Sequence, residues 1–318
     1  MPGFIVSLIA LAWIFSLVDW RDVKAALYQA DYRYLVPVII LYIFGLAARG
    51  VAWQLLLQGG STYTQVFLTV NIGYLLNNLL PLRLGEFGRA FLLGRHGLGF
   101  WRVLSTILVE RSFDMIVIAG MLLGSLPFVF GVFQSYQFAL ILLLIVLFGL
   151  FLLYLLANRE QIVYKILERI GIRLPGLYIF LKDKLQAFLL GLKALTKPWD
   201  FLKVFGWMMM TWIFALGAQF LLLKAFLPHA SFVWIVFGQG LVALGAAAPS
   251  SPAYVGVIEA AWVGALTTFG IHSSTALAYA ISSHLLNIVV TGLIGGYALV
   301  REGDSISELY CQLREKIR

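Results

Sequence analysis

Long apolar runs without charged residues dominate the hydrophobic and polar pattern of this chain. The run from Phe138 to Leu156 contains no charge and is almost wholly apolar. About 20 such residues in a helix span the hydrocarbon core of a bilayer. The pattern predicts an all-α, polytopic integral membrane protein with apolar segments at 3–18, 35–57, 65–80, 101–124, 136–157, 204–227, 233–248, 253–271 and 274–300.

Three of these segments are too short for a full span. The segment 65–80 is followed by Pro81, and 233–248 is separated from 253–271 by Pro249-Ser250-Ser251-Pro252. Proline and glycine break helices, and a broken helix at membrane depth is tolerated where it faces protein or a water-filled cavity. We therefore predict six full spans and two re-entrant helical hairpins, one at each break.

Composition and charge support a membrane protein and predict its orientation. Hydrophobic residues make up 61% of the chain and charged residues 12%, with a net charge of +8. Lysine and arginine gather in 158–200, in 83–102 and after Val300, whereas 125–135 is uncharged and 19–34 is balanced. Because basic loops stay in the cytoplasm, we expect a multi-pass protein of the plasma (inner) membrane with both termini inside. The basic excess is attributed to this topology, and no nucleic-acid partner is expected.

Other features narrow the domain organisation and the chemistry. Residues 1–318 are expected to form one transmembrane domain, in which 1–18 is a retained first span and 158–200 an amphipathic segment on the cytoplasmic surface. Cys311 is the single cysteine, which excludes a disulfide framework. No nucleotide-binding or metal-ligand motif occurs, so we expect no cofactor and no primary active transport by this chain alone.

Polar residues repeat along the chain at an offset of 173 residues. This offset relates Glu86 to Glu259 and Asp114 to Asn287, and it also relates Gly97 to Gly270 and Arg111 to His284. The two copies, at about 35–124 and 208–297, enter the membrane from opposite sides in the expected topology. Inverted repeats with broken helices are typical of transporters, and the breaks mark the substrate site.

Three charged residues lie within five positions of an otherwise apolar span. They are Glu110, Arg111 and Asp114, and each charge near the bilayer centre costs roughly 2.5–3.5 kcal/mol on insertion scales. Arg111 and Asp114 are three apart and can pair on one helix face, while Glu110 points elsewhere and needs another partner. The group is either a buried ion-pair network that only fixes helix packing or part of a substrate pathway.

A second charged group follows the first break. A helix that starts near Leu84 places Glu86 in its first turn, where the helix dipole favours a carboxylate. Arg83 and Arg89 can then hold an anionic group, since arginine binds phosphate through a planar, two-pronged fork. The alternative is that both are ordinary arginines at the cytoplasmic interface.

Further polar residues near the breaks and in the last span complete the candidate set. Ser250 and Ser251 offer hydroxyls, although their sequence is equally typical of a tight turn between two helices. His284 either titrates near neutral pH or is a packing residue with a satisfied hydrogen bond. The candidate substrate-binding residues are Asn77, Asn78, Arg83, Glu86, Arg89, Glu110, Arg111, Asp114, Ser250, Ser251, Glu259, His284 and Asn287.

The stretch Asn77–Glu86 with Arg89, followed by Glu110-Arg111 and Asp114, resembles a known family. This is the flippase-like family of the lysylphosphatidylglycerol synthase transmembrane region, the membrane half of MprF-type proteins and of many stand-alone homologues. The sequence Pro252-Ala253 with Gly256 and Glu259 is similar to a second signature, in which many members have Pro-Gly. The resemblance covers about 35–300.

The resemblance implies a polytopic protein that moves or binds lipids with charged headgroups. MprF-type members act on aminoacylated phosphatidylglycerol and carry a soluble transferase domain; this chain ends at Arg318, so no synthase activity is expected. Phospholipids, glycolipids and polyprenyl-phosphate carriers are further candidate substrates. The alternatives to a lipid translocase are an intramembrane enzyme acting on a lipid-linked substrate and a lipid-binding partner of a separate synthase or glycosyltransferase. Membrane lipids are the expected partners, with a homo-oligomer or a separate lipid-modifying enzyme as others.

Overall fold

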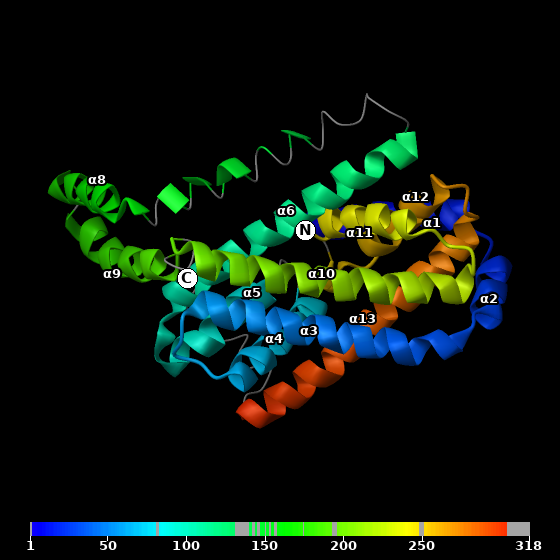
Figure 1. Cartoon of the computed structure of the whole chain (residues 1–318), viewed down its shortest axis with the longest axis horizontal. Helices are drawn as coiled ribbons and strands as arrows, with labels where there is room; N and C mark the ends of the chain where they lie inside the picture. The colour runs from blue at the N-terminus through cyan, green and yellow to red at the C-terminus, as the bar shows by residue number, and fades with distance from the viewer. Residues whose placement is uncertain are drawn as a thin grey trace.

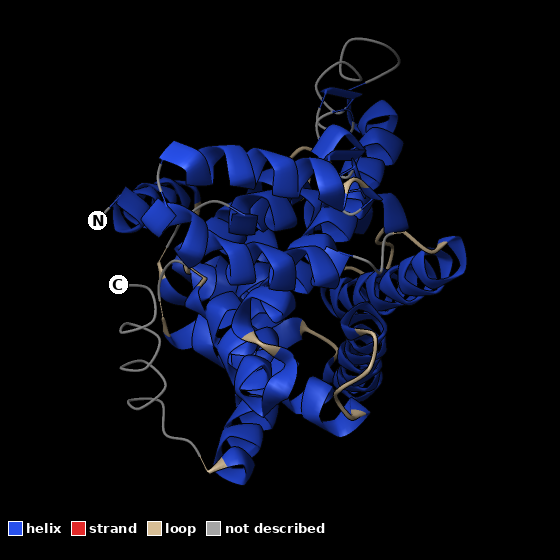
Figure 2. Ribbon diagram, turned by 90° about the vertical axis from the view of Figure 1, so that its left-hand side faces the viewer, coloured by secondary structure: helices blue, strands red, loops and turns tan. Residues whose placement is uncertain are grey.

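Helices make up the described part of the chain, which contains no strand (Figure 2). The computed structural model describes residues 2–80, 83–130, 196–247 and 251–303, and 140–192 with gaps at 142–143, 145–146, 150, 153, 156–157 and 174. Four helices are long and apolar enough to cross a membrane, namely Tyr32–Leu57, Phe100–Val129, Pro198–Phe226 and Ser273–Glu302. The all-α membrane class is thus confirmed. The count of six spans stays a prediction, because 136–157 lies largely outside the described residues.

The first half of the chain contains two long helices and, between them, two shorter ones. Thr62 caps the first short helix, because its side chain accepts from the Gln65 amide while the Gln65 side chain accepts from the Thr62 amide. The break between the short helices includes Pro81, which lies outside the described residues. The elements are α3 (Leu35–Leu57), α4 (Tyr63–Leu79), α5 (Leu84–Leu93), the π-helical turn η2 (Gly94–Leu98) and α6 (Phe100–Phe130).

The second half has the same order of long, short, short and long helices. The break between its short helices contains Pro252, and Ala253 and Tyr254 there adopt left-handed backbone conformations. The neighbouring Pro249 and Ser250 lie outside the described residues. The elements are α10 (Pro198–Phe226), α11 (Phe232–Ala247), the short helix η4 (Pro252–Tyr254), α12 (Val257–Thr267) and α13 (Ser273–Glu302).

The remaining helices correct two expectations about loops. The segment 19–34, expected to be a loop, contains a helix because the Asp19 side chain accepts from the Arg21 amide and starts it. Of the loop expected at 125–135, the first six residues belong to α6, which continues through Pro127 to Phe130, and 131–135 lie outside the described residues. The other elements are α1 (Pro2–Leu17), α2 (Trp20–Gln29), η1 (Tyr32–Tyr34), α8 (Glu160–Arg173) and α9 (Pro175–Leu192).

Helices α3 and α10 lie side by side and run in opposite directions (Figure 1). The Asp31 amide, just before α3, donates to the Ala225 carbonyl near the end of α10 at 2.9 Å. Helix α4 packs on α13, and α11 packs on α6. Trp53 of α3 and Trp262 of α12 are fully enclosed in two separate apolar clusters. This packing brings the two helix breaks together, with the Arg83 guanidinium 5.8 Å from the centre of the Tyr254 ring.

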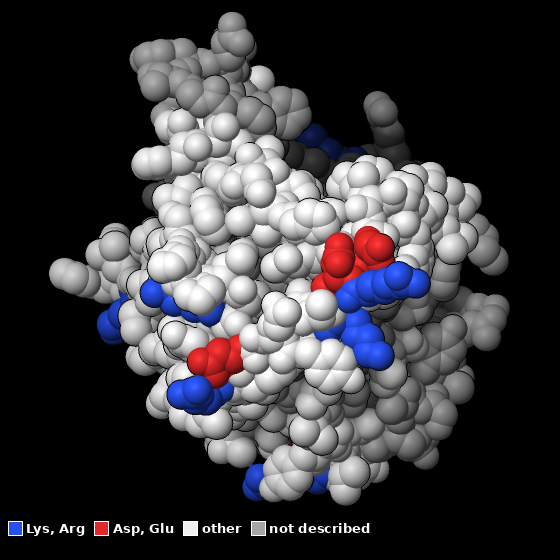
Figure 3. All heavy atoms as spheres, turned by 90° about the vertical axis from the view of Figure 1, so that its right-hand side faces the viewer, with Lys and Arg blue, Asp and Glu red and all other residues white. Residues whose placement is uncertain are grey.

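Charged side chains lie at both ends of the bundle. The end that carries α2 shows acidic and basic side chains next to each other (Figure 3), and this segment holds Asp19, Asp22 and Asp31 against three basic residues. At the other end, Arg95 of η2 lies 3.7 Å from Glu302, at the end of α13. At a rise of 1.5 Å per residue, the 30 residues of α13 separate the two ends by about 45 Å.

Candidate functional site

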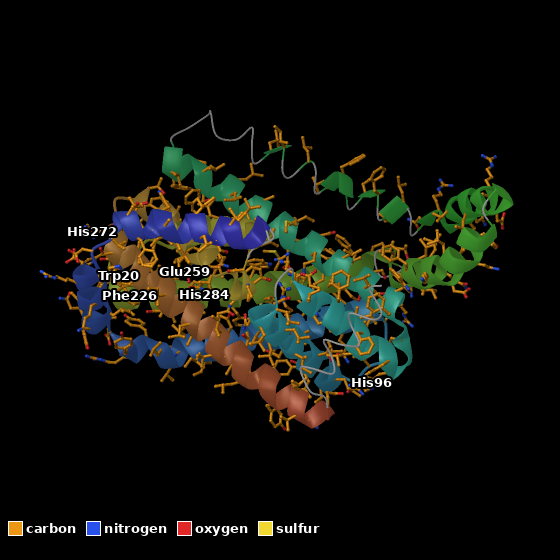
Figure 4. All side chains as sticks on the ribbon, turned by 180° about the vertical axis from the view of Figure 1, so that it is seen from behind. Trp20, His96, Phe226, Glu259, His272 and His284 are labelled. Carbon is orange, nitrogen blue, oxygen red and sulfur yellow. The ribbon has the colours of Figure 1, made fainter. Side chains whose placement is uncertain are left out.

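A cavity of about 220 Å³ opens between the two helix breaks, α3, α6, α10, α11 and α13. Glu259 and His284 are labelled in Figure 4 and lie between the two ends of the bundle, which His272 and His96 mark. The structure thus brings most of the predicted residues together in the interior. The predicted residues that line the cavity are Asn77, Asn78, Arg83, Glu86, Arg89, Arg111, Asp114, His284 and Asn287.

Glu110 is completely buried and is not among the residues that line this cavity; its role in substrate binding stays a prediction. Its side chain accepts from three arginines. Arg49 donates to Oε1 at 2.6 Å, Arg89 donates to Oε2 at 2.5 Å, and Arg111 donates to Oε1 at 3.0 Å. The Arg89 guanidinium also stacks 3.9 Å from the Trp53 ring. These arginines are the partners that the isolated glutamate required.

Asp114 is held one helical turn further along α6. Both of its oxygens accept from Arg49, at 2.6 and 3.1 Å, and the Trp212 indole donates to Oδ1 at 3.0 Å. The Arg111 guanidinium lies 3.2 Å from Oδ2 of the same carboxylate. The predicted pairing of Arg111 with Asp114 on one helix face is confirmed.

Arg49 is the residue of this cluster that the sequence reasoning missed. It interrupts the apolar segment 35–57 and is only 6% exposed. The available signal was its position, because an arginine deep inside a span is costly and marks a partner or a pathway. Its guanidinium joins α3 to both carboxylates of α6, and it therefore fixes the base of the cavity.

Arg83 and Glu86 form a looser pair at the break between α4 and α5. Helix α5 begins at Leu84, as expected, and Glu86 is in its first turn. The Glu86 carboxylate is 3.8 Å from Arg83 and 3.7 Å from Arg111, beyond hydrogen-bonding distance in both cases. The Nε atoms of Arg83 and Arg111 are buried and have no hydrogen-bond partner among the described residues. Unused guanidinium donors therefore border the cavity.

Glu259 and His284 form a satisfied pair on the other side. His284 Nδ1 lies 2.6 Å from Glu259 Oε1, and the Gly256 amide donates to Oε2 at 2.7 Å. Glu259 does not line the cavity, whereas His284 does. The glutamate therefore anchors the start of α12 and orients the histidine, and its predicted role in substrate binding stays a prediction.

The amides and serines at the breaks have mainly local roles. Asn77 Oδ1 accepts from the Gly85 amide at 2.8 Å, as expected for a backbone group freed by the break, and Asn78 donates to Thr291 at 3.0 Å. Ser251 does not line the cavity; its hydroxyl donates to the Val255 carbonyl at 3.1 Å and accepts from Ser7 of α1. This supports the alternative of a turn. Ser250 lies outside the described residues.

The charges of the cluster leave it with a basic excess. Arg49, Arg83, Arg89 and Arg111 face three carboxylates, those of Glu86, Glu110 and Asp114. The formal balance is thus +1 before the Glu259–His284 pair is counted. Within the described residues, no group of three or more His, Cys, Asp or Glu side chains is placed to hold a metal ion. The arrangement suits an anionic group that accepts hydrogen bonds from guanidinium nitrogens.

Comparison with known proteins agrees with this architecture over the whole chain. A UPF0104 membrane protein of Methanothermobacter thermautotrophicus is 24% identical over 330 aligned positions, which cover 97% of this chain and 96% of that protein. A second relative, named glycosyltransferase AglD of Haloferax volcanii, is 27% identical over 125 residues, 38% of this chain and 20% of that protein.

No solved structure is significantly similar to the chain. The family model described as the lysylphosphatidylglycerol synthase TM region matches residues 2–295. The resemblance stated from the residues at the first break is thereby confirmed. The chain belongs to the family of the lysylphosphatidylglycerol synthase TM region.

Proposed function

We propose that this protein is a membrane lipid translocase whose cavity binds the phosphate of an anionic headgroup. The observation that carries the proposal is Arg83, whose buried Nε is unpartnered at a cavity in the interior of the bundle. An unsatisfied buried donor is costly, and a phosphate oxygen satisfies it through a charge-assisted hydrogen bond. The acyl chains stay in the surrounding lipid while the headgroup occupies the cavity.

Two hairpins that enter from opposite membrane faces support transport. The loop before α4 packs on Leu98 after α5, so both ends of the first hairpin are near η2, where Arg95 meets Glu302 at the end of α13. In the second hairpin, Trp234 stacks on Phe269, close to the start of α13. Because α13 is about 45 Å long, the hairpins start at opposite ends of the bundle. Both are re-entrant in this proposal.

An inverted repeat relates the two hairpins. At the offset of 173 residues, the starts of α5 and α6, Leu84 and Phe100, correspond to the starts of α12 and α13, Val257 and Ser273. The packing of α4 on α13 corresponds to that of α11 on α6, and the corresponding helices α3 and α10 are antiparallel. The residues that the offset equates also make equivalent contacts, Glu86 with Arg111 and Glu259 with His284. Such a repeat allows a cavity to open alternately to each face.

The distribution of basic residues supports an orientation with the η2 end in the cytoplasm. Arg95 lies beside Glu302 and Arg102 donates to the Leu57 carbonyl at that end, where the α8–α9 segment also lies (Figure 1), and the α2 end is balanced in charge. Basic segments are retained on the cytoplasmic side. The proposed location is the plasma membrane with both termini inside.

Translocation is favoured over intramembrane catalysis by the state of the carboxylates. Glu110 and Asp114 accept from arginines, and Glu259 is held by a histidine and a backbone amide. A general base needs a carboxylate that is able to take a proton from substrate. These three are engaged already, and Glu86, which lines the cavity, faces the two guanidinium groups of Arg83 and Arg111. The name of the family points to lipid chemistry, and this chain would supply the movement or binding of the lipid.

Reconstitution into liposomes tests the proposal. Fluorescent phosphatidylglycerol in the inner leaflet becomes accessible to a membrane-impermeant quencher when it is moved outward. Arg83→Gln should slow this exposure about tenfold or more, since a hydrogen bond between charged groups contributes roughly 1.5–3 kcal/mol. The matched control is Arg33→Gln, because the Arg33 side chain is 93% exposed at the α2 end. Wild-type protein that moves no phospholipid, equal rates for Arg83→Gln and wild type, or a lipid product of changed mass would overturn the proposal.

A further inference from the structure

A second cavity of about 180 Å³ adjoins the first and is lined differently. The two share part of their walls, including Arg49, Trp212 and Gln239. The walls of the second cavity alone include the hydroxyl groups of Tyr42, Thr211 and Thr291 and the carboxamide of Gln219. No aspartate or glutamate is among its lining residues, which all lie in the described part of the chain. Its one charged lining residue, Arg49, is ion-paired with Glu110 and Asp114, so it forms a neutral polar chamber beside a basic one.

Gln239 lines both cavities and carries an unsatisfied group. Its Oε1 atom is buried and has no hydrogen-bond partner among the described residues. Buried carbonyl oxygens are nearly always paired, and an unpaired one lowers stability. Because Gln239 lines both cavities, a ligand that carries a donor is the natural partner for this oxygen.

Gln219 is held so that its amino group remains a donor. The hydroxyls of Tyr279 and Ser283 both donate to its Oε1, at 2.8 and 2.9 Å. These two bonds fix the carboxamide, and its Nε2 is the group left to interact with a ligand in the chamber that Gln219 lines. The chamber thus presents an acceptor on α11 and a donor on α10. A hydroxyl group matches both, since it donates and accepts.

A cationic headgroup is poorly matched to the same walls. An ammonium group has three donors and no acceptor and needs a carboxylate nearby when it leaves water. The Glu110 and Asp114 carboxylates are engaged by three arginines and that of Glu259 by His284, while the loosely paired Glu86 lines only the first cavity.

We infer that the neutral chamber binds an uncharged, hydroxyl-bearing headgroup attached to the phosphate that the arginines hold. The substrate class is therefore an anionic phosphodiester lipid with a polyol or sugar headgroup. This inference rests on the proposed function and assigns the part of the lipid beyond the phosphate. Gln239 is the specificity-determining residue.

Competition between lipids, measured by native mass spectrometry, distinguishes the contribution of the neutral chamber to lipid binding from that of the arginines. The probes are phosphatidylglycerol, phosphatidylinositol and phosphatidylethanol with identical acyl chains; the last has the phosphodiester charge but no hydroxyl. Gln239→Leu should weaken binding of the two hydroxyl lipids about three- to tenfold, as expected for one hydrogen bond, and leave phosphatidylethanol unchanged. Its melting temperature should not fall, because the variant removes an unpaired buried oxygen.

Two further variants complete the test. Arg83→Gln should weaken the binding of all three lipids alike. Ser282→Ala should not weaken the binding of any of them, because the Ser282 hydroxyl donates to the Ala278 carbonyl of its own helix and Ser282 lines neither cavity. Equal losses for all three lipids in Gln239→Leu, or preferential binding of a lysyl- or ethanolamine-phospholipid by wild type, would overturn the inference and leave the proposed function standing. Wild-type protein that does not prefer any phosphate lipid over diacylglycerol would overturn both.

Discussion

Glu110 should be the charged residue on which the fold depends most, and Glu110→Gln tests this. Four hydrogen bonds from Arg49, Arg89 and Arg111 converge on its carboxylate, which has no exposed surface. The glutamine is nearly isosteric, so packing is kept while the negative charge is lost. Arg49, Arg89 and the partly exposed Arg111 then keep only Asp114 and the more distant Glu86 as anionic neighbours.

The expected magnitude follows from this imbalance. Removing one member of a buried, hydrogen-bonded ion cluster costs about 3–5 kcal/mol, because the remaining charges stay buried without compensation. For a chain of this size, such a loss lowers the melting temperature on the order of 10 °C. Glu86→Gln is the matched control in the same cluster. Its ion pairs, at 3.7 and 3.8 Å, are too long for hydrogen bonds, and its side chain is 20% exposed, so we expect a loss below about 1 kcal/mol.

Thermal unfolding of both variants in the same detergent, followed by size-exclusion chromatography of the surviving protein, measures the difference. The double variant Glu110→Gln/Arg89→Met should recover part of the loss, since it removes a buried positive charge together with its partner. A melting temperature of Glu110→Gln within 2 °C of wild type, on the scale of about 2–4 °C per kcal/mol, would refute the reasoning. So would an equal effect of Glu86→Gln.

Three other changes test the helix breaks and the base of the cavity. Gly85→Ala should destabilise by about 1–3 kcal/mol in thermal unfolding, because its Cβ would overlap the Gly73 carbonyl, whereas Gly120→Ala, which meets no atom within 4 Å, should stabilise slightly. Ala253→Gly should raise stability by up to about 1 kcal/mol, because Ala253 has φ +54° and glycine adopts this conformation without strain; a lower melting temperature would contradict it. Arg49→Met should lower stability by about 3–5 kcal/mol and reduce transport, and unchanged unfolding would show that the α3–α6 ion pairs contribute nothing.

The sequence predicts the features that break its apolar pattern. Pro81 and Pro252 mark both helix breaks, and the start of α5 at Leu84 is where the charge pattern placed it. Glu110 and Asp114 stand out because charges within a span are rare. These signals are local in sequence. Nine of the thirteen candidate residues chosen from them line one cavity.

Tertiary packing decides what the sequence leaves open. The sequence indicates that Glu110 needs a partner, and three arginines are candidates. Only the packing of α3 and α5 on α6 shows that all three contact it. Gln239 is a single polar residue in an apolar helix, and its importance appears only when its oxygen is seen to be unpaired. The contacts of Ser251 likewise depend on α1, because Ser7 of that helix, 244 residues away in sequence, donates to the Ser251 hydroxyl.

The two interpretations of the intramembrane charges, a packing network and a substrate pathway, apply to different layers of one site. Glu110, Asp114 and Arg49 are buried and fully paired, so a ligand gains nothing by approaching them and their removal acts through stability. Arg83 and Gln239 line the cavities and carry unsatisfied buried atoms. These atoms lower the stability of the empty protein, and a bound ligand that forms hydrogen bonds with them offsets this loss. A protein in which these atoms served folding alone would be more stable with both replaced by apolar residues. A variant with both residues replaced that gains stability and loses lipid binding would therefore distinguish the ligand-binding residues from the residues that only stabilise packing.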